Sequence, residues 1–402
     1  MKIFLLLLFT ASSLIADDPY IKSLRAYKDG NELSAPIIRN GEKLKIEFDI
    51  EANHSPDFIL LFRFCDQNWK PYENIFLHNN GFNTEYNLWY DKLPTSVDGA
   101  DYRYEGTFPS NNVKFPFSGK WKYYITDISD TSDVYAMGRF IYIDKTIPIS
   151  VSLKRERLQG RSTSPSNYGQ IYNITTKFII PDSLEEFRVK NTEILANRMF
   201  DFPIVINRDF NESNRYFEWN GTDQFQFSAQ DVQPGNEYRQ TNLLDINKYS
   251  ENGTTAQFNG VDVSRSFISG RRDFNGAYKL MSPQNVNADY IDVTFELRAP
   301  INIYDNIYLT GSFVDWKVFP EFKMNKDKND LHNITLELKR GIYDYQYITG
   351  VQKGEQIKEI DWLILEGNDW YTKNEYFVFV YYKTEKKGGY DEIIGYKQIL
   401  SK

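Results

Sequence analysis

Cysteine and histidine are scarce in this chain, and their scarcity limits the chemistry it can perform. The 402 residues include one cysteine, Cys65, and three histidines, His54, His78 and His332. A single thiol cannot form an internal disulfide, so the fold must rely on its hydrophobic cores. No histidine stands at metal-ligand spacing from another histidine or from the cysteine. The sequence therefore predicts no metal site.

Catalytic and cofactor motifs are missing as well. The sequence has no nucleophile elbow, no phosphate-binding loop and no dinucleotide glycine fingerprint. A glycoside hydrolase would need two carboxylates that flank a cleft, and a pair such as Glu355 and Glu359 has the right chemistry. Among 55 acidic residues such pairs arise by chance, so we interpret these two as solvated surface. The sequence predicts no enzyme, no catalytic residue and no cofactor.

Basic clusters and long hydrophobic runs are absent after the first residues. The formal net charge is −8, which argues against a nucleic-acid partner. Residues 1–16 combine Lys2, the apolar run Ile3–Phe9 and small residues up to Ala16, which is the pattern of a signal peptide. That run is too short to cross a bilayer, and no later stretch approaches the roughly 20 apolar residues of a spanning helix. We predict an exported chain without direct membrane insertion.

Aromatic side chains, in contrast, are abundant. The chain is 16% aromatic and 41% hydrophobic, a composition that favours pleated sheets and allows large cores. Its length exceeds that of one sandwich. We therefore predict an all-β protein of tandem immunoglobulin-like β-sandwich domains. The expected boundaries are 17–145 for the first domain, 146–286 for a middle domain with long loops, and 287–402 for the last.

Alternating apolar and polar residues place the first strands. Leu44, Ile46, Phe48 and Ile50 alternate with charged residues, and the run 57–65 is apolar on both faces, as a central strand would be. Cys65 ends that run, which predicts a small buried side chain. Residues 183–197 fit either a helix or a strand, and periodicity alone does not decide between them.

The region near the carboxyl end carries the clearest pattern. Ile334, Leu336 and Leu338 alternate with polar residues, as in a strand with one buried face. Arg340 and Gly341 are expected to reverse the chain into an adjacent strand, whose Tyr343, Tyr345 and Tyr347 share one face. Residues 375–382 and 393–394 are expected to continue this last domain.

One short motif points to carbohydrate. Gly311-Ser-Phe-Val-Asp-Trp316 resembles the Gly-Ser-Phe-Asn-Asn-Trp signature of glycogen-binding modules, which are early-set immunoglobulin-like domains. The resemblance covers roughly residues 306–370 and implies an exposed indole that stacks on sugar rings. That family places a lysine where this chain has Gln346. The alternative interpretation is an indole packed over its own turn in an inherited sandwich.

A second resemblance extends over nearly the whole mature chain. Its landmarks, in order, are Lys22–Arg39, Phe64–Trp69, Pro234–Arg239, Gly311–Trp316 with Gly341–Tyr347, Glu366–Asn368 and Tyr390–Tyr396. In this order they resemble the type IX secretion plug-protein family. The resemblance implies a string of β domains, which favours a strand over residues 183–197.

The plug-family resemblance also implies a location and a partner. It implies a periplasmic protein, without catalysis, on the inner side of the outer-membrane β-barrel of the type IX translocon, which it closes when the barrel is idle. The family motif assigns no contact residues. Aromatic side chains on turns are good interface anchors, so we name Trp69, Trp89 and Trp316 as candidate partner-binding residues. A periplasmic carbohydrate-binding protein that uses Trp316 is the alternative function.

Overall fold

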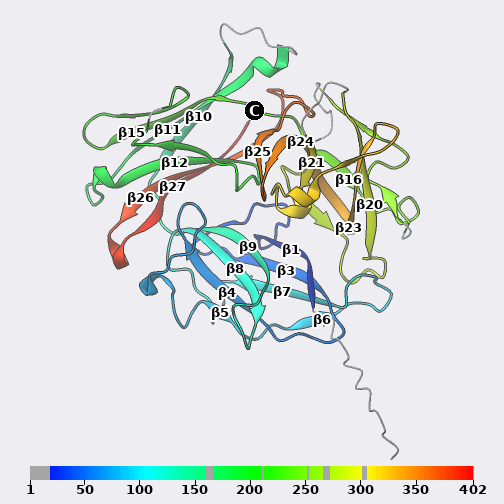
Figure 1. Cartoon of the computed structure of the whole chain (residues 1–402). Helices are drawn as coiled ribbons and strands as arrows, with labels where there is room; N and C mark the ends of the chain where they lie inside the picture. Colours follow the sequence, from blue (N-terminus) through cyan, green and yellow to red (C-terminus); the bar gives the residue numbers. More distant parts are fainter. Residues whose placement is uncertain are drawn as a thin grey trace, which may run out of the picture.

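Six β-sheets, paired face to face into three sandwiches, make up the fold (Figure 1). The structure is a computed structural model that describes residues 19–158, 166–210, 212–250, 253–265, 272–300 and 306–401. Within these ranges the chain forms strands and short 3-10 helices but no α-helix. The all-β, multi-sandwich prediction is therefore confirmed. The predicted signal peptide, residues 1–16, lies outside the described residues.

The first sandwich is built from residues 20–143. One sheet has the order β1 (Tyr20–Lys28), β3 (Leu44–Glu51), β7 (Tyr102–Phe108), β6 (Tyr90–Lys92), and the facing sheet has the order β2 (Ile37–Arg39), β9 (Val134–Ile143), β8 (Gly119–Asp127), β4 (Phe58–Cys65), β5 (Thr84–Glu85). Alternate residues of β3 and β4, among them Phe48 and Phe62, fill the core between the sheets. Cys65 is buried, as predicted, and burial raises the pKa of its thiol to about 12.

The middle sandwich contains strands from two distant parts of the chain. One sheet has the order β10 (Ile149–Arg157), β11 (Gln170–Ile179), β15 (Gln224–Val232), β14 (Arg215–Trp219), and the other has the order β13 (Ile204–Asn207), β12 (Val189–Ala196), β26 (Glu375–Thr384), β27 (Tyr390–Leu400). Most of the ambiguous segment 183–197 thus forms a strand, because β12 lies between β13 and β26 and pairs with both, while Glu186–Arg188 form a short 3-10 helix before it.

The third sandwich is inserted between β15 and β26. Its first sheet contains β16 (Arg239–Asn242), β19 (Tyr278–Leu280), β21 (Asn306–Gly311), β24 (Gly341–Lys353) and β25 (Gln356–Asp361); its second contains β17 (Thr254–Thr255), β18 (Asp262–Val263), β20 (Tyr290–Arg298), β22 (Asn325–Lys326) and β23 (His332–Lys339). Tyr343, Tyr345 and Tyr347 of β24 all point into its core, as their spacing predicted.

Short 3-10 helices lie in the connections. They are η1 (Ile75–Leu77), η2 (Ser166–Gly169), η3 (Glu186–Arg188), η4 (Ser312–Val314), η5 (Pro320–Phe322) and η6 (Lys386–Gly388). Among the described residues no helix is long and apolar enough to span a bilayer.

Two expectations about the carboxyl-terminal half need correction. The sheets do not follow the expected boundary at 286/287: β16 and β19, before it, pair with β24, while β26 and β27, after it, complete the middle sandwich. The turn at Arg340 and Gly341 is not a hairpin. It carries the chain from β23, which pairs with β20, across to β24 in the opposite sheet. Sequence periodicity shows which residues of a strand are buried but not which strand lies beside it.

The amino-terminal sandwich lies against both others (Figure 1). Its contact with the middle sandwich is an apolar cluster that includes Ile37 and Ile141 on one side and Phe377 and Phe379 on the other. A smaller cluster joins Leu93 and Val97 to Tyr290 of the third sandwich. The three domains are therefore joined by shared cores rather than by flexible linkers alone.

Charged residues are also buried between the domains. Asp49 of β3 is fully buried, where it accepts hydrogen bonds from Arg103 at 2.9 Å, from the Tyr290 hydroxyl at 2.9 Å and from the Lys339 ammonium. Lys339 belongs to the third sandwich. Asp49 and Glu47 lie on the polar face of β3, and both are buried because the third sandwich covers that face.

A second buried ion pair joins the first and middle sandwiches. Lys120 of β8 and Glu193 of β12 are each about 1% exposed, and their charged groups are 2.9 Å apart. The Lys120 ammonium also donates to the Gln67 carbonyl at 2.7 Å and lies 4.8 Å from the Trp69 ring centroid. Burial raises the pKa of the Glu193 carboxyl, and the positive charge of Lys120 opposes that rise.

A third group of buried charges lies inside the third sandwich. Asp344 accepts hydrogen bonds from the backbone N–H groups of Phe274 and Gly276, at 2.8 and 2.9 Å, and from the Gln240 amide at 2.9 Å. Asp273 and Glu237 are buried nearby. Burial raises the pKa of both Asp344 and Asp273, and the pKa of Asp273 is raised further by the repulsion between the carboxylates. These side chains therefore favour the protonated state.

Removing Lys120 tests the buried ion pair between the first and middle sandwiches. Lys120→Met leaves Glu193 buried without its cation, and we expect a loss of about 3–5 kcal/mol in the free energy of unfolding, measured by urea denaturation at pH 7.5. The double variant Lys120→Met with Glu193→Leu should recover most of that loss, because both charges are gone. Lys122→Met, a half-buried lysine on the same strand, is the control. A double variant as unstable as the single one would contradict the explanation.

Asp344→Asn tests the buried carboxyls. Because the folded-state pKa is raised, the unfolded chain ionises first as the pH rises above about 4, and stability is lost as the pH approaches neutral. The amide cannot ionise, so relative to wild type it should gain at least about 1.4 kcal/mol at pH 8, the equivalent of one pKa unit, and little at pH 4.5. The exposed Asp292→Asn serves as the control. Equal gains at both pH values would refute this account.

Candidate functional site

The turn after β4 points its indole inward. The Asp66 carboxylate accepts the backbone N–H groups of Asn68 and Lys70, both at 2.8 Å, and Trp69 adopts a positive φ of 64°. Its ring is only 8% exposed and packs edge-on against Phe200 of the middle sandwich, with ring centroids 5.9 Å apart. Trp69 therefore joins two domains, and the expectation that it lies exposed for a partner is wrong.

Trp316 is buried too. It is 1% exposed, its indole N–H donates to the Gly276 carbonyl at 2.8 Å, and its ring lies 4.1 Å from that of Tyr238. Gln346, at the position of the family lysine, is also buried and donates to the Trp362 carbonyl. The sugar-stacking surface expected from the glycogen-binding motif is therefore not formed by this indole, because neighbouring segments cover it.

The carboxylates considered for a hydrolase lie on an exposed hairpin. Glu355 and Glu359 are exposed residues of the β24–β25 hairpin, and Glu359 pairs with Lys353. The hydrogen bond from Lys353 lowers the pKa of Glu359, which keeps it ionised and unsuited to act as a general acid. In the part of the chain that the structure describes, no group of three or more His, Cys, Asp or Glu side chains is arranged to hold a metal ion.

Trp89 is the one exposed residue of the three candidate tryptophans. It is 85% exposed, in the segment between β5 and β6. Four other large apolar side chains in the same part of the chain are exposed, and we call them, together with Trp89, the apolar rim: Ile75, Phe76, Phe82, Tyr86 and Trp89. Figure 1 shows β5 and β6 at the lower edge of the amino-terminal sandwich.

Local structure explains why the apolar rim faces outward. The side-chain oxygen Oδ1 of Asn74 accepts a hydrogen bond from the Phe76 backbone N–H at 3.0 Å and so caps η1. Leu77 of η1 is buried in the core. One inward residue in a single 3-10 turn leaves its neighbours Ile75 and Phe76 in solvent. The Asn74 amide also donates to the Lys387 carbonyl at 2.7 Å, which ties η1 to the middle domain.

Contacts on the far side of the segment hold the rest of the apolar rim. The Asn79 amide donates to the Phe82 and Lys114 carbonyls, and the Lys114 ammonium lies 4.2 Å from the Phe82 ring centroid. Glu85 accepts from Ser110 at 2.9 Å and from Asn112 at 2.7 Å. The segment is thus held in place while its large side chains stay exposed, an arrangement suited to burying them against another protein.

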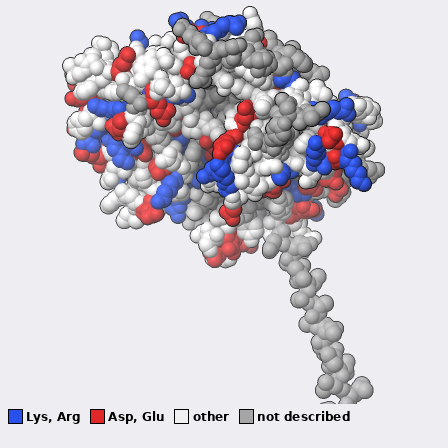
Figure 2. Space-filling model, turned by 45° about the horizontal axis from the view of Figure 1, so that its top comes forward, with Lys and Arg blue, Asp and Glu red and all other residues white. Residues whose placement is uncertain are grey.

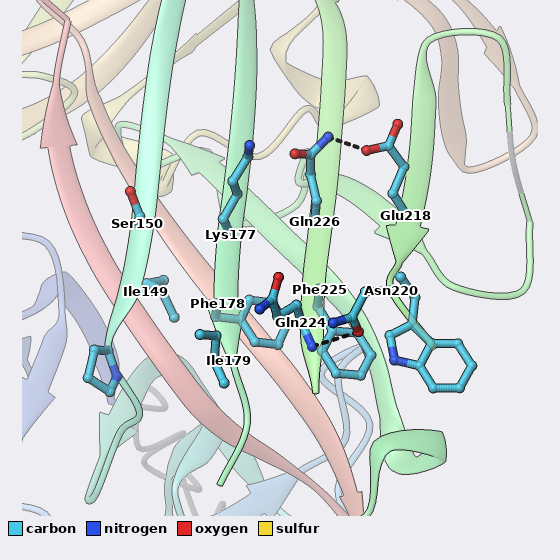
Figure 3. Close-up of a pocket in the computed structure, with 12 residues that line it drawn as sticks. Ile149, Ser150, Lys177, Phe178, Ile179, Glu218, Asn220, Gln224, Phe225 and Gln226 are labelled. Carbon is cyan, nitrogen blue, oxygen red and sulfur yellow. Dashed lines mark hydrogen bonds between the residues drawn. The ribbon is translucent and has the colours of Figure 1, made fainter. Parts of the chain in front are cut away.

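A second apolar surface lies on the middle sandwich (Figure 3). It is a groove of about 940 Å³ at the end of the β10–β11–β15–β14 sheet, where Ile179 and Trp219 are exposed. Figure 3 shows a polar row across the four strands, with a hydrogen bond of 2.6 Å from Gln226 to Glu218; that row is Ser150, Lys177, Gln226 and Glu218. Ile179, Phe225 and Trp219 give the groove an apolar part, and Lys177 and Glu218 are the charged residues of its lining.

The apolar rim is identified by its exposed aromatic and aliphatic side chains. Figure 2 shows Lys and Arg side chains interspersed with Asp and Glu over the face that it presents. Sequence analysis missed four of the five residues of the apolar rim because Ile75, Phe76, Phe82 and Tyr86 follow no period. The available signal was large apolar residues among asparagines and glycines, where turns are expected.

Comparison with known proteins places the apolar rim in a recognised domain. Residues 21–144 match the family model described as the type 9 secretion system plug protein 1st domain, and all five residues of the apolar rim fall within this range. No curated protein matches the chain.

A solved structure shares the whole architecture. The crystal structure of a hypothetical protein from Parabacteroides merdae superposes with a TM-score of 0.74 over 94% of this chain and 97% of that one, at 20% sequence identity. At this identity the likeness concerns the fold alone, and it extends over all three sandwiches. The family resemblance noted in the sequence is confirmed for the amino-terminal sandwich, which matches the first domain of the type 9 secretion system plug protein over residues 21–144.

Proposed function

We propose that this protein is a periplasmic plug subunit that binds the outer-membrane β-barrel of the type IX translocon and closes the periplasmic opening of the barrel when it is idle. The observation that carries the proposal is the position of the apolar rim within the domain that matches the plug family. Export by the signal peptide predicted in residues 1–16 would deliver the chain to the periplasm.

The apolar rim has the chemistry of a protein interface. Tyr and Trp combine a large apolar area with a polar group, and such residues carry most of the binding energy at many interfaces. A seal over a wide pore should bury more than the roughly 1,200–2,000 Å² of an ordinary specific interface. The five side chains of the apolar rim would form only part of that footprint.

Rigid connections between the domains also suit a plug. Buried ion pairs and apolar clusters join the first sandwich to each of the others, so a force on one domain is transmitted to all three. The family consists of secretion components without catalysis, and we propose that this chain is likewise not an enzyme. The carbohydrate-binding alternative loses its main support because Trp316 is buried.

Variants of the apolar rim test the docking surface. Trp89→Ala and Phe76→Ala should each weaken binding to the barrel by about 2 kcal/mol, because each removes an exposed anchor. The measurement is the amount of barrel protein that co-purifies with the tagged chain from detergent-solubilised outer membranes. Thermal unfolding of both variants should match that of wild type, since these side chains lie outside the core.

A matched control separates the apolar rim from general stickiness. Phe187 of the middle sandwich is 64% exposed, close to the 66% of Phe76, and Phe187→Ala should leave co-purification unchanged. Trp219→Ala tests the groove of the middle sandwich in the same way. Should Trp219→Ala abolish co-purification while the rim variants retain it, the docking surface would lie on the middle sandwich and our assignment would be wrong.

Loss of the plug should leave an open pore. A strain that lacks this protein but retains the barrel should admit a large antibiotic or dye that the parent strain excludes, and wild-type protein should restore the barrier. A strain lacking both the protein and the barrel is the control for indirect damage to the envelope. Unchanged permeability in the presence of an intact, unoccupied barrel would remove the sealing role.

A further inference from the structure

The three sandwiches meet around a cavity that the proposed sealing role does not use. Its volume is about 240 Å³, far more than the roughly 10–15 Å³ that a single water requires. Arg25 of β1 and Arg139 of β9 line it from the first sandwich, Arg198 from the turn after β12, and Lys317 from the turn after η4. Met137 also lines the cavity and is exposed, so the cavity is open to solvent on that side.

Two of the four cations are neutralised by carboxylates. Arg25 pairs with Glu47, and with Glu32 at 3.2 Å. Arg139 binds both carboxylate oxygens of Asp201 in the middle sandwich. Its Nε also donates to Asp315 of the third sandwich at 3.0 Å. These pairs hold the walls of the cavity in place and satisfy their own charges.

The other two cations have no carboxylate of their own. Neither Arg198 nor Lys317 forms an ion pair with any residue in the described ranges, and the guanidinium of Arg198 donates only to the backbone carbonyl of Ser34. Burial lowers the pKa of Arg198 to about 10, and the charges of Asp315 and Glu375 oppose that fall without pairing with the guanidinium, so it remains charged at neutral pH. An anion in direct contact with such a cation offsets part of the cost of burying it.

We propose that this cavity, which we call the junction site, binds a small oxyanion, such as phosphate or a carboxylate, between Arg198 and Lys317. Guanidinium groups match the geometry of these anions, and a charge-assisted hydrogen bond is stronger than a neutral one. The Asp315 carboxylate is engaged by Arg139, so the ion lies on the Arg198 side of the cavity. The bound ion contacts side chains of the middle and third sandwiches and therefore stabilises their arrangement.

Ligand-dependent thermal stability of the purified mature chain tests the junction site. The probes are sodium phosphate and sodium malonate, each titrated in a buffer free of other oxyanions, with sodium chloride at matched ionic strength as the reference. We expect a saturable rise in Tm with at least one oxyanion beyond the effect of chloride, and direct binding by isothermal titration calorimetry. The two probes distinguish a phosphate site from a carboxylate site.

Two variants and a control locate the effect. Arg198→Gln and Lys317→Gln should each weaken the binding of the effective oxyanion about tenfold or more, the factor expected when one charged hydrogen bond is lost. Arg63→Gln should not, because Arg63 is also half-buried without an ion pair but lies outside the cavity. If Arg198→Gln fails to fold, Lys317→Gln still decides the matter. Absence of a saturable effect in wild type, or retention of it in Lys317→Gln, would overturn the proposal.

Discussion

Burial of charge between domains is the constraint on which the rest of this structure depends. Lys120–Glu193 and Asp49–Lys339 lie across the two contacts of the amino-terminal sandwich, and each charge is acceptable there only while its partner is present. An apolar contact could slide by a residue at little cost, whereas a buried ion pair allows one register. The domains therefore have one relative arrangement, and the exposed surfaces of the three sandwiches are fixed with respect to each other.

The sequence predicted which side chains of a strand face a core, because that depends on neighbouring residues in the chain. It did not predict which domains pack against each other. Alternation in β3 and β24 identified the residues that face a core, because side chains of a strand alternate whatever lies beside it. Alternation does not show what lies over the opposite, polar face of β3, where the third sandwich covers Glu47 and Asp49. The expectation that Trp69 and Trp316 are exposed was wrong for the same reason. A turn residue is exposed in an isolated domain and becomes buried when another domain or segment packs over it.

The fixed arrangement of the domains also fixes which large apolar side chains are exposed. Trp69 and Trp316 contribute to internal contacts, whereas the aromatic residues of the apolar rim are exposed. Trp89 and Phe76 satisfy no internal requirement, and the segment that carries them is nevertheless held by Asn74, Asn79 and Glu85. An ordered segment with exposed apolar side chains is the feature on which the proposed docking surface rests.

The insertion of the third sandwich into the middle one affects the order in which the chain can fold. Strands β10 to β15 are synthesised well before β26 and β27, with the third sandwich in between, so half of the middle sandwich is at first without its partner strands. Tyr390 of β27 also completes the core of the first sandwich. The last strands act as a closing element for two domains at once. A chain interrupted before residue 375 would retain all strands of the third sandwich. It would expose apolar residues of the other two sandwiches, and we expect such a chain to aggregate or to be degraded.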